Sequence, residues 1–241
     1  MHLNHENVRG AVRMIAEVMP LPVKVFVLVV LVGVMSLLSG CSSALSGNSL
    51  PAVHANSDEE TIVLVRHGEL APGGLGQLNC KGLNRAIALP SVLVSRFGSA
   101  NAIFAPNPSV QIREGTPPTE YSYVRALATI EPTAIRLGLP VGTQIAYNDP
   151  TDLQAVVTAS AYTKSTIFIA WEHANAYHFA QNILKAYGQD ASVVPAWNSN
   201  DFDMIYVFHI TPPANGSGLG QLSFEAQAEG LNHLLDSNCP I

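Results

Sequence analysis

The chain has 241 residues, of which 48% are hydrophobic and 12% are charged, a composition that excludes extended disorder over most of its length. Twelve Lys and Arg against eighteen Asp and Glu give a net charge of −6 at pH 7, with His neutral. This charge excludes general nucleic-acid binding, which requires many cations to neutralise phosphates. A leader of 40 residues would leave enough chain for one domain with a full core, and too little for two.

The first 40 residues have the pattern of a secretion signal. Basic residues precede the apolar run Val25–Leu38, which is followed by Leu38-Ser39-Gly40-Cys41. The tetrapeptide resembles a bacterial lipobox, which implies cleavage before Cys41 and lipidation of that cysteine. The alternative is an uncleaved membrane helix, but the run is shorter than the roughly 20 apolar residues that a span requires.

The lipobox resemblance also bears on localisation. Ser42, rather than Asp, follows the cysteine, so by the Gram-negative sorting pattern we expect an outer-membrane lipoprotein that faces the periplasm. Residues 41–60 are small, polar and proline-containing, as in a flexible tether. The chain is therefore predicted to consist of a signal peptide (1–40), a lipidated tether (41–60) and one domain (61–241).

From Thr61 onwards, strand-like and helix-like segments alternate. Thr61–Val65 is a short apolar run typical of a central parallel strand. Gly82–Phe97 has helical spacing of its apolar residues, with Pro90 as a kink, and Ala102–Ala105 is a second strand. The polar stretch 107–120 is expected to be a loop, and Tyr121–Leu137 a helix interrupted by a proline.

The second half continues this alternation. Ile145–Tyr147 is predicted as a short strand and Thr151–Tyr162 as a helix capped by Thr151. Thr166–Trp171 is another apolar strand, and Ala174–Tyr187 an amphipathic helix that ends before a glycine. Two late strands follow, at Met204–Ile210 and Gln221–Ala226.

This order of elements predicts an α/β fold in which helices cover both faces of a mainly parallel central sheet. In such sheets ligands bind beyond the carboxyl ends of the strands. Two predicted strands end in histidine, because Thr61–Val65 leads into Arg66-His67-Gly68-Glu69 and Thr166–Trp171 leads into Glu172-His173. A further cation, Arg125, lies near the start of a predicted helix. These side chains are expected to form one cationic pocket suited to a phosphoryl group.

The same residues resemble the histidine phosphatase superfamily, which includes the phosphoglycerate mutases and acid phosphatases. The opening motif of that family matches Val65–Glu69, and its next helix start, L-T-x-x-G-x-x-Q-A, matches Leu78–Ala86 with two changes. The family's strand ending in Ser-Pro corresponds to Phe104–Pro106, its R-A-x-x-T helix to Arg125–Thr129, and its second histidine to His173. The matches cover almost the whole predicted domain.

The resemblance implies a phosphoglycerate mutase-like fold and a phosphatase mechanism. His67 would attack phosphorus and form a phosphohistidine, while Arg66, Arg125 and His173 would hold the phosphoryl oxygens. Gly68 would let the backbone approach the ligand closely. The expected partner is a small phosphorylated substrate of unknown identity, and the family chemistry requires neither a cofactor nor a metal.

The resemblance does not assign the general acid, because the second histidine is followed by Ala174 where most family members have Gly or Asp. Glu172 is the first candidate, and Asp149 and Glu69 are the alternatives. The irregular position leaves open a non-catalytic envelope lipoprotein of the same fold that binds a phosphate-bearing ligand. A phosphomutase fits less well, since it would need cytoplasmic substrates and longer insertions.

Two cysteines remain if Cys41 carries lipid. In an export compartment Cys80 and Cys239 can pair, which would tie the C-terminal tail to the loop around Cys80; two free thiols are equally compatible with the sequence. His178 and His209 are interpreted as structural residues and Arg113 as a solvated charge.

Overall fold

The computed structural model describes residues 58–214 and 218–240. The predicted signal peptide, the predicted lipidation site Cys41 and nearly all of the predicted tether lie outside the described residues. Residues 51–241 form one compact unit, and the fold below concerns its described part. Within that part, no helix combines the length and the apolar character needed to cross a membrane.

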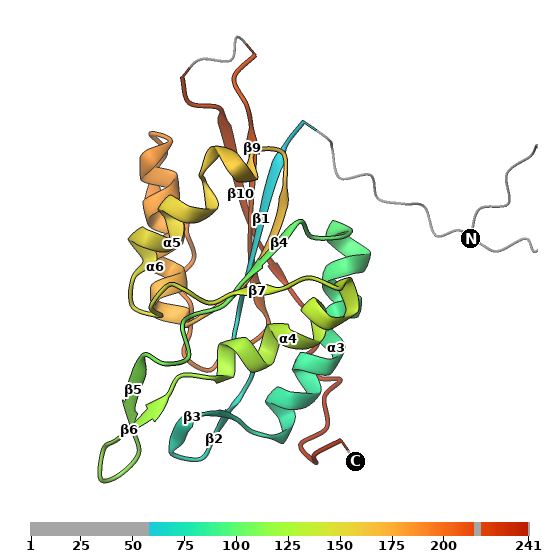
Figure 1. The fold of residues 1–241 in the computed structure, drawn as a ribbon, viewed down its shortest axis with the longest axis vertical. Helices are drawn as coiled ribbons and strands as arrows, with labels where there is room; N and C mark the ends of the chain where they lie inside the picture. Colours follow the sequence, from blue (N-terminus) through green and yellow to red (C-terminus); the bar gives the residue numbers. More distant parts are fainter. Residues whose placement is uncertain (1–57, 215–217, 241) are drawn as a thin grey trace, which may run out of the picture. The chain divides into compact units, whose positions relative to one another are not determined.

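A six-stranded sheet forms the centre of this unit (Figure 1). In spatial order the strands are β10 (Gln221–Ala228), β9 (Met204–Thr211), β1 (Glu60–Arg66), β8 (Thr166–Trp171), β4 (Ala102–Phe104) and β7 (Val141–Gly142). Four of them, β1, β8, β4 and β7, are mutually parallel, whereas β9 is antiparallel to both of its neighbours. The predicted α/β fold with a mainly parallel sheet is confirmed.

The two central strands are apolar because both of their faces are covered. All six residues of β8 are buried, as are six of the seven residues of β1. The strands run in register from Thr61 opposite Thr166 to Arg66 opposite Trp171. Such strands lack the polar–apolar alternation of a half-exposed sheet, which is why the sequence reads as continuous apolar runs.

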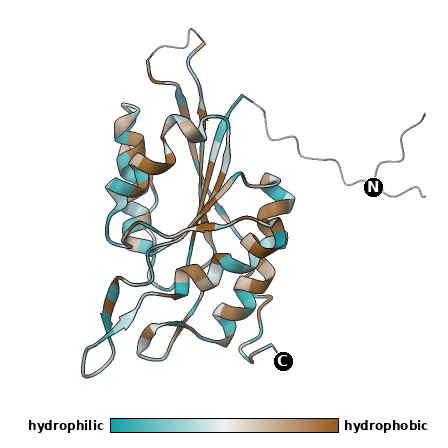
Figure 2. Cartoon of the chain, in the orientation of Figure 1, coloured by the Kyte–Doolittle hydropathy of each residue, from teal (hydrophilic) through white to brown (hydrophobic). Residues whose placement is uncertain are grey.

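Helices cover both faces of the sheet. On one face, α3 (Cys80–Phe97) and α4 (Arg125–Leu137) pack through Leu89, Leu93 and Ile130; on the other, α5 (Pro150–Val157) and α6 (His173–Ala186) pack through Leu153, Phe179 and Ile183. Figure 2 shows hydrophobic residues along the central strands and alternating hydrophobic and hydrophilic segments along the helices. Burial of these apolar stripes is the main force that holds helices to sheet.

Some predicted helix ends were wrong because the capping residue lies elsewhere. The side chain of Asn79 accepts a hydrogen bond from Gly82 N at 2.8 Å, so α3 begins at Cys80 rather than Gly82. Asp149, not Thr151, caps α5, which ends at Val157; a separate 3₁₀ helix follows at Ser160–Tyr162. Another short 3₁₀ helix lies at Ala191–Val193.

The region 107–122 departs most from the prediction. Instead of a loop it contains the antiparallel hairpin of β5 (Gln111–Glu114) and β6 (Thr119–Ser122), so the helix predicted from Tyr121 begins only at Arg125. The hairpin lies against a second hairpin, β2 (Leu70–Ala71) with β3 (Gly74–Leu78). This tertiary contact, which a polar and proline-rich sequence does not reveal, makes the segment extended.

The strand predicted at Ile145–Tyr147 was also wrong. The edge strand is β7, which pairs with β4 from Ile103–Val141 to Phe104–Gly142. Ile145 is buried, but its carbonyl oxygen accepts a hydrogen bond from the amide of Asn107 at 2.7 Å outside the sheet. An apolar residue can therefore be buried by a loop contact without belonging to a strand.

The C-terminal segment is fixed to α3. A disulfide joins Cys80 to Cys239, which confirms the hypothesised pairing. The side-chain amide of Asn84 donates to the carbonyl oxygens of Asp236 and Asn238 at 2.9 and 2.7 Å. The chain that follows β10 is thus held at the N-terminal half of α3.

Candidate active site

The candidate site lies where the parallel strands β1 and β8 end together. The amide of His67 donates to the carbonyl oxygen of Trp171 at 3.0 Å, one step beyond the last paired residues. His67 therefore leaves β1 beside the point where Glu172 and His173 leave β8. Arg125 is the first residue of α4. The structure brings these elements to the carboxyl edge of the sheet, where α/β proteins bind ligands.

His67 is held in one orientation by two contacts. Its Nδ1 lies 2.7 Å from the carbonyl oxygen of Gly68, and its Nε2 lies 3.3 Å from Nε of Arg125. A carbonyl oxygen only accepts hydrogen bonds, so we assign the proton to Nδ1 and the lone pair to Nε2. Burial, followed by the charge of Arg125, lowers the pKa of His67 to about 3. The imidazole is therefore neutral at physiological pH.

The guanidinium of Arg125 is bound to a carboxylate that was not predicted. Nη1 and Nη2 of Arg125 donate to the two oxygens of Glu114, at 3.0 and 2.5 Å. Burial acts to raise the pKa of Glu114, but the hydrogen bonds from Arg125 and from the amide of Gly76 outweigh it and lower the pKa. Glu114 is thus ionised, and it takes up the pair of donors that a phosphoryl group would use.

Arg66 is also buried, and its Nη1 binds backbone carbonyl oxygens of the loop before β9. Nη1 donates to the carbonyl oxygens of Asn198, Ser199 and Asp201 at 3.3, 2.7 and 2.8 Å, while the guanidinium lies 3.9 Å from the centre of the Phe202 ring. Burial lowers the pKa of Arg66 to about 10, so the side chain remains a cation at neutral pH. Its Nε is buried without a hydrogen-bond partner among the described residues.

Tyr123 contributes a second buried donor that lacks an acceptor. The residue is fully buried, and its hydroxyl has no hydrogen-bond partner within the described part of the chain. The ring lies edge-on to His67, with 6.2 Å between ring centres, and its centre is 4.8 Å from the guanidinium carbon of Arg125. Because burial raises the pKa of Tyr123, the hydroxyl keeps its proton and can donate it to an oxyanion.

Glu172 does not have the surroundings of a general acid. Its carboxylate caps α6 by accepting from the amides of Ala174 and Asn175 at 3.0 and 2.9 Å, and Nδ1 of His173 lies 2.6 Å from Oε1. Burial acts to raise the pKa of Glu172, but the contact with His173 and these amide hydrogen bonds lower it to about 2. A carboxyl group with this pKa is ionised and holds no proton to donate.

The alternative acids are engaged elsewhere as well. Asp149 caps α5, where its side chain accepts from the amide of Asp152 at 3.0 Å. Glu69 is paired with Arg85 through two hydrogen bonds of 3.0 and 2.9 Å. Each of the three carboxylates considered from the sequence therefore has a structural partner.

Gly68 is explained by packing between backbones rather than by approach to a ligand. A Cβ atom at Gly68 would lie 2.8 Å from the carbonyl oxygen of Gly82, and one at Gly82 would lie 2.3 Å from that of Glu69. The amide of Gly68 donates to Oγ1 of Thr129 at 2.9 Å, and that hydroxyl donates to the carbonyl oxygen of Arg125 at 2.8 Å. These contacts fix His67 relative to α4.

The predicted residues Arg66, His67 and Arg125 are therefore close together, and the charge of Glu172 acts on both Arg66 and His67. Sequence reasoning missed Glu114 and Tyr123. Tyr123 stands two residues before Arg125, which is a weak signal, whereas nothing in the sequence marked Glu114. In residues 58–214 and 218–240, no group of three or more His, Cys, Asp or Glu side chains is placed to hold a metal ion.

No protein-family model matches the chain, and no curated protein matches it. Among solved structures, a mycobacterial glucosyl-3-phosphoglycerate phosphatase is 11% identical, with 70% of this chain and 98% of that one covered and a TM-score of 0.46. A protein histidine phosphatase SixA complexed with tungstate is 12% identical, with coverages of 70% and 97% and a TM-score of 0.44. A phosphoglycerate mutase from Plasmodium falciparum is 12% identical, with coverages of 68% and 89% and a TM-score of 0.44. At such identities, the chemistry of this chain must rest on its own residues.

Proposed function

We propose that the protein is a phosphoester hydrolase that works through a phosphohistidine on His67. The observation that carries the proposal is the state of this imidazole. Burial keeps it neutral, Gly68 holds the proton on Nδ1, and Nε2, which carries the lone pair, accepts a hydrogen bond from Nε of Arg125. A neutral, oriented imidazole beside a guanidinium is suited to attack phosphorus.

The surrounding donors suit the charge of the reaction. In the first step the Nε2–P bond forms and the bond between phosphorus and the ester oxygen breaks. That oxygen departs with the bonding electron pair and takes up a proton from water. Water then breaks the N–P bond and releases inorganic phosphate. Arg66 Nε and the Tyr123 hydroxyl are buried donors without partners in the described structure. We propose that Arg125 and His173 also contact the phosphoryl oxygens once a ligand is bound. Such donors stabilise the equatorial oxygens of the transferred group.

A binding protein without turnover is the second candidate, and one observation favours it. Glu172, Asp149 and Glu69 all have structural roles, so no carboxyl group among these three is available to protonate a poor leaving group. In this alternative the pocket would still bind a phosphate-bearing ligand, but an ester with a poor leaving group would persist. Phosphate release from an ester whose leaving group needs no acid therefore separates the two candidates, because a binding protein would not turn over even that ester.

The test is phosphate release from 4-nitrophenyl phosphate, whose leaving group needs little help from an acid. We expect turnover by the wild-type protein and its loss in His67→Ala. His178→Ala is the matched control, because His178 is exposed on α6. Quenching in alkali, in which phosphohistidine survives, should trap one phosphoryl group per chain. Wild-type turnover in His67→Ala would refute the mechanism, and phosphate binding without any turnover would establish the second candidate.

We also infer that the protein is an envelope lipoprotein that faces the periplasm, in agreement with the lipobox at Cys41. The disulfide between Cys80 and Cys239 supports an oxidising compartment. Labelling with a palmitate analogue should mark the wild-type chain and leave Cys41→Ser unlabelled. Equal labelling of both proteins, or of neither, would contradict this localisation.

A further inference from the structure

The carboxylate bound to Arg125 belongs to a β-hairpin, whereas His67 follows strand β1 and Arg125 begins helix α4. Glu114 is the last residue of β5, and the β5–β6 hairpin (residues 111–122) connects the end of β4 with α4. Both oxygens of Glu114 accept from Arg125, and Oε2 also accepts from the amide of Gly76 at 2.8 Å. These donors form a site for a planar, bidentate anion.

Two glycines of β3 leave room for the carboxylate of Glu114 and for the hairpin that carries it. A Cβ atom at Gly74 would lie 2.3 Å from a carboxylate oxygen of Glu114, and one at Gly76 would lie 2.1 Å from the carbonyl oxygen of Ser122 in β6. Both glycines have positive φ angles, of 83° and 64°, which favour glycine. The hairpin therefore packs on a backbone surface from which side chains are missing, and the contact is part of the fold rather than a surface ion pair.

The charges of the site indicate how the Arg125–Glu114 pair affects the binding of a phosphoryl group. Arg66 and Arg125 carry two positive charges, and Glu114 and Glu172 carry two negative ones. His67 is only 2% exposed, with Arg125 and its bound carboxylate beside Nε2. A phosphoryl group that approaches Nε2 needs the same guanidinium donors that Glu114 occupies. The two anions cannot share them without strong repulsion.

We propose that Glu114 is an internal ligand of the oxyanion site, and that a substrate phosphoryl group binds Arg125 by displacing its carboxylate. The inference rests on the proposed function, because it assigns the same pocket to a phosphoryl group. Displacement removes the hairpin's ion pair with α4 and its hydrogen bond with β3. The β5–β6 hairpin is then the element that moves when the site opens, and Glu114 lowers the affinity for every oxyanion.

The test is calorimetric titration of the full-length protein with inorganic phosphate. Glu114→Gln removes the competing charge with little change of shape, so we expect phosphate to bind at least tenfold more tightly than to the wild type. Glu120→Gln is the matched control, because Glu120 is exposed on β6 of the same hairpin and its loss changes the net charge equally. The control should bind phosphate within twofold of the wild type.

A second measurement needs no variant and remains informative if Glu114→Gln folds poorly. Hydrogen exchange is followed in wild-type peptides that cover residues 111–122, with and without saturating phosphate. Displacement of Glu114 should make the hairpin amides exchange faster when phosphate is bound, although a bound ligand usually slows exchange. Unchanged or slower exchange would overturn the inference.

The outcomes separate this inference from the proposed function. Equal phosphate affinity of the wild type, Glu114→Gln and Glu120→Gln overturns the internal-ligand role, while turnover that depends on His67 still upholds the phosphatase. Tighter binding by Glu114→Gln alone supports the internal ligand even if no ester is hydrolysed. A fall in turnover of poor leaving groups in Glu114→Gln, without tighter phosphate binding, overturns the inference and makes Glu114 the general acid.

Discussion

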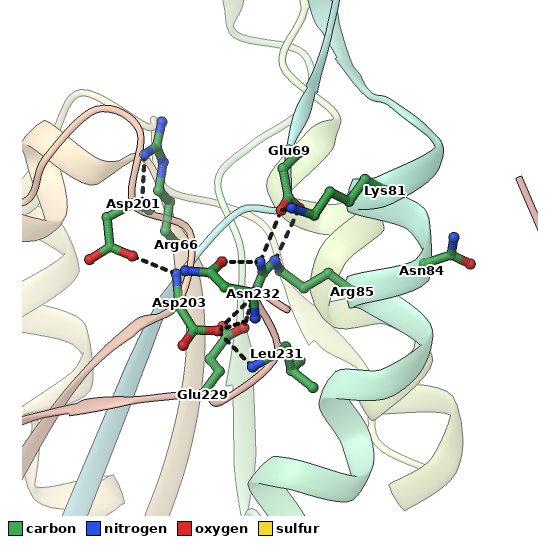
Figure 3. A network of polar contacts seen from close by, with 12 residues as sticks. Arg66, Glu69, Lys81, Asn84, Arg85, Asp201, Asp203, Glu229, Leu231 and Asn232 are labelled. Carbon is green, nitrogen blue, oxygen red and sulfur yellow. Dashed lines mark hydrogen bonds and ion pairs between the residues drawn. The ribbon is translucent and has the colours of Figure 1, made fainter. Parts of the chain in front are cut away.

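Two buried arginines, Arg85 and Arg125, are both bound to carboxylates, yet their surroundings differ. Arg85 is fully buried, and Figure 3 shows it between Glu69, Asp203 and Glu229, with Lys81 also beside Glu69. Asp203 in turn accepts from the amides of residues 230–232. The partners of Arg85 thus come from three separate segments, namely the loop after β1, the residue before β9 and the chain after β10.

Arg125 has one carboxylate partner, Glu114, which lies on a hairpin with exposed residues on both strands. The number of carboxylate partners and the exposure of the segments that carry them therefore distinguish the two arginines. Loss of Arg85 would leave three carboxylates close together, whereas loss of Glu114 would leave a cation that an oxyanion can neutralise. From this comparison we expect the Arg85 cluster to contribute more to the stability of the fold than the Arg125–Glu114 pair, which we propose is displaced by a bound oxyanion.

The largest effect is expected from Arg85→Met, which keeps the volume of the side chain and removes its charge. Glu69, Asp203 and Glu229 would face one another without the guanidinium, so the free energy of unfolding should fall by about 3–5 kcal/mol. Urea denaturation measures this change. Arg113→Met is the control, since Arg113 is exposed on β5, and it should stay within about 0.5 kcal/mol of the wild type. Equal stability of Arg85→Met and Arg113→Met would contradict the structural role of the Arg85 cluster.

The next largest effect is expected from a substitution of Gly68. This residue connects His67 in the candidate site to Glu69 in the Arg85 cluster. Gly68→Ala forces its Cβ against the backbone of Gly82, which cannot move aside as a flexible side chain can. We expect a loss of about 1–3 kcal/mol in unfolding free energy, and a larger proportional loss of turnover because His67 shifts.

Gly82→Ala approaches the same contact from α3, where its Cβ would meet the carbonyl oxygen of Glu69. It should destabilise the protein at least as much as Gly68→Ala, as thermal unfolding can show. If both variants unfold like the wild type, the two glycines are not in close contact, and the position of His67 needs another explanation.

The Arg85 cluster should also make stability depend on pH. Burial, opposed by Arg85, raises the pKa of Glu229 to about 8 from an ordinary 4.5. The folded state therefore binds this proton more tightly than the unfolded state, so its contribution is complete below about pH 4.5 and is lost as pH rises through 8. Glu229→Gln, which mimics the protonated form, should lose less unfolding free energy than the wild type between pH 6 and 9, by about 2–3 kcal/mol.

Glu60 is expected to contribute with the same sign, because burial raises its pKa to about 7. The difference between the stability curves of the wild type and Glu229→Gln isolates the part that belongs to the cluster. Parallel curves across this pH range would show that Glu229 is ionised throughout and that Arg85 overcomes the cost of burial.

The sequence was sufficient for the central part of the fold. The strand Thr166–Trp171 was predicted to the residue, because a strand buried on both faces appears as an unbroken apolar run. His67 was identified because it follows a predicted strand and belongs to the Val65–Glu69 motif. Arg125 was identified because it lies near the start of a predicted helix and opens the Arg125–Thr129 motif. Local patterns therefore locate the residues that regular secondary structure positions.

The sequence was insufficient where long-range contacts decide the structure. The segment 107–120 is polar and contains prolines, and only its contact with β3 makes it a hairpin. Nothing in the sequence therefore marked Glu114, although it is bound to Arg125 in the candidate site. Similarly, Glu172 was considered an acid because it is next to His173, but the contact with His173 itself, followed by the amides of Ala174 and Asn175, lowers its pKa to about 2.

The smallest effect is expected from Glu172→Gln, which separates a capping role from a catalytic one. A glutamine oxygen can still accept from the amides of Ala174 and Asn175, but the charge that stabilises the N-terminus of α6 is lost, at a cost of about 0.3–1 kcal/mol. Turnover of aryl phosphates should fall by the same small factor for good and poor leaving groups. A loss that grows as the leaving group becomes poorer would restore Glu172 as the proton donor, and Glu114 would then have no claim to that role.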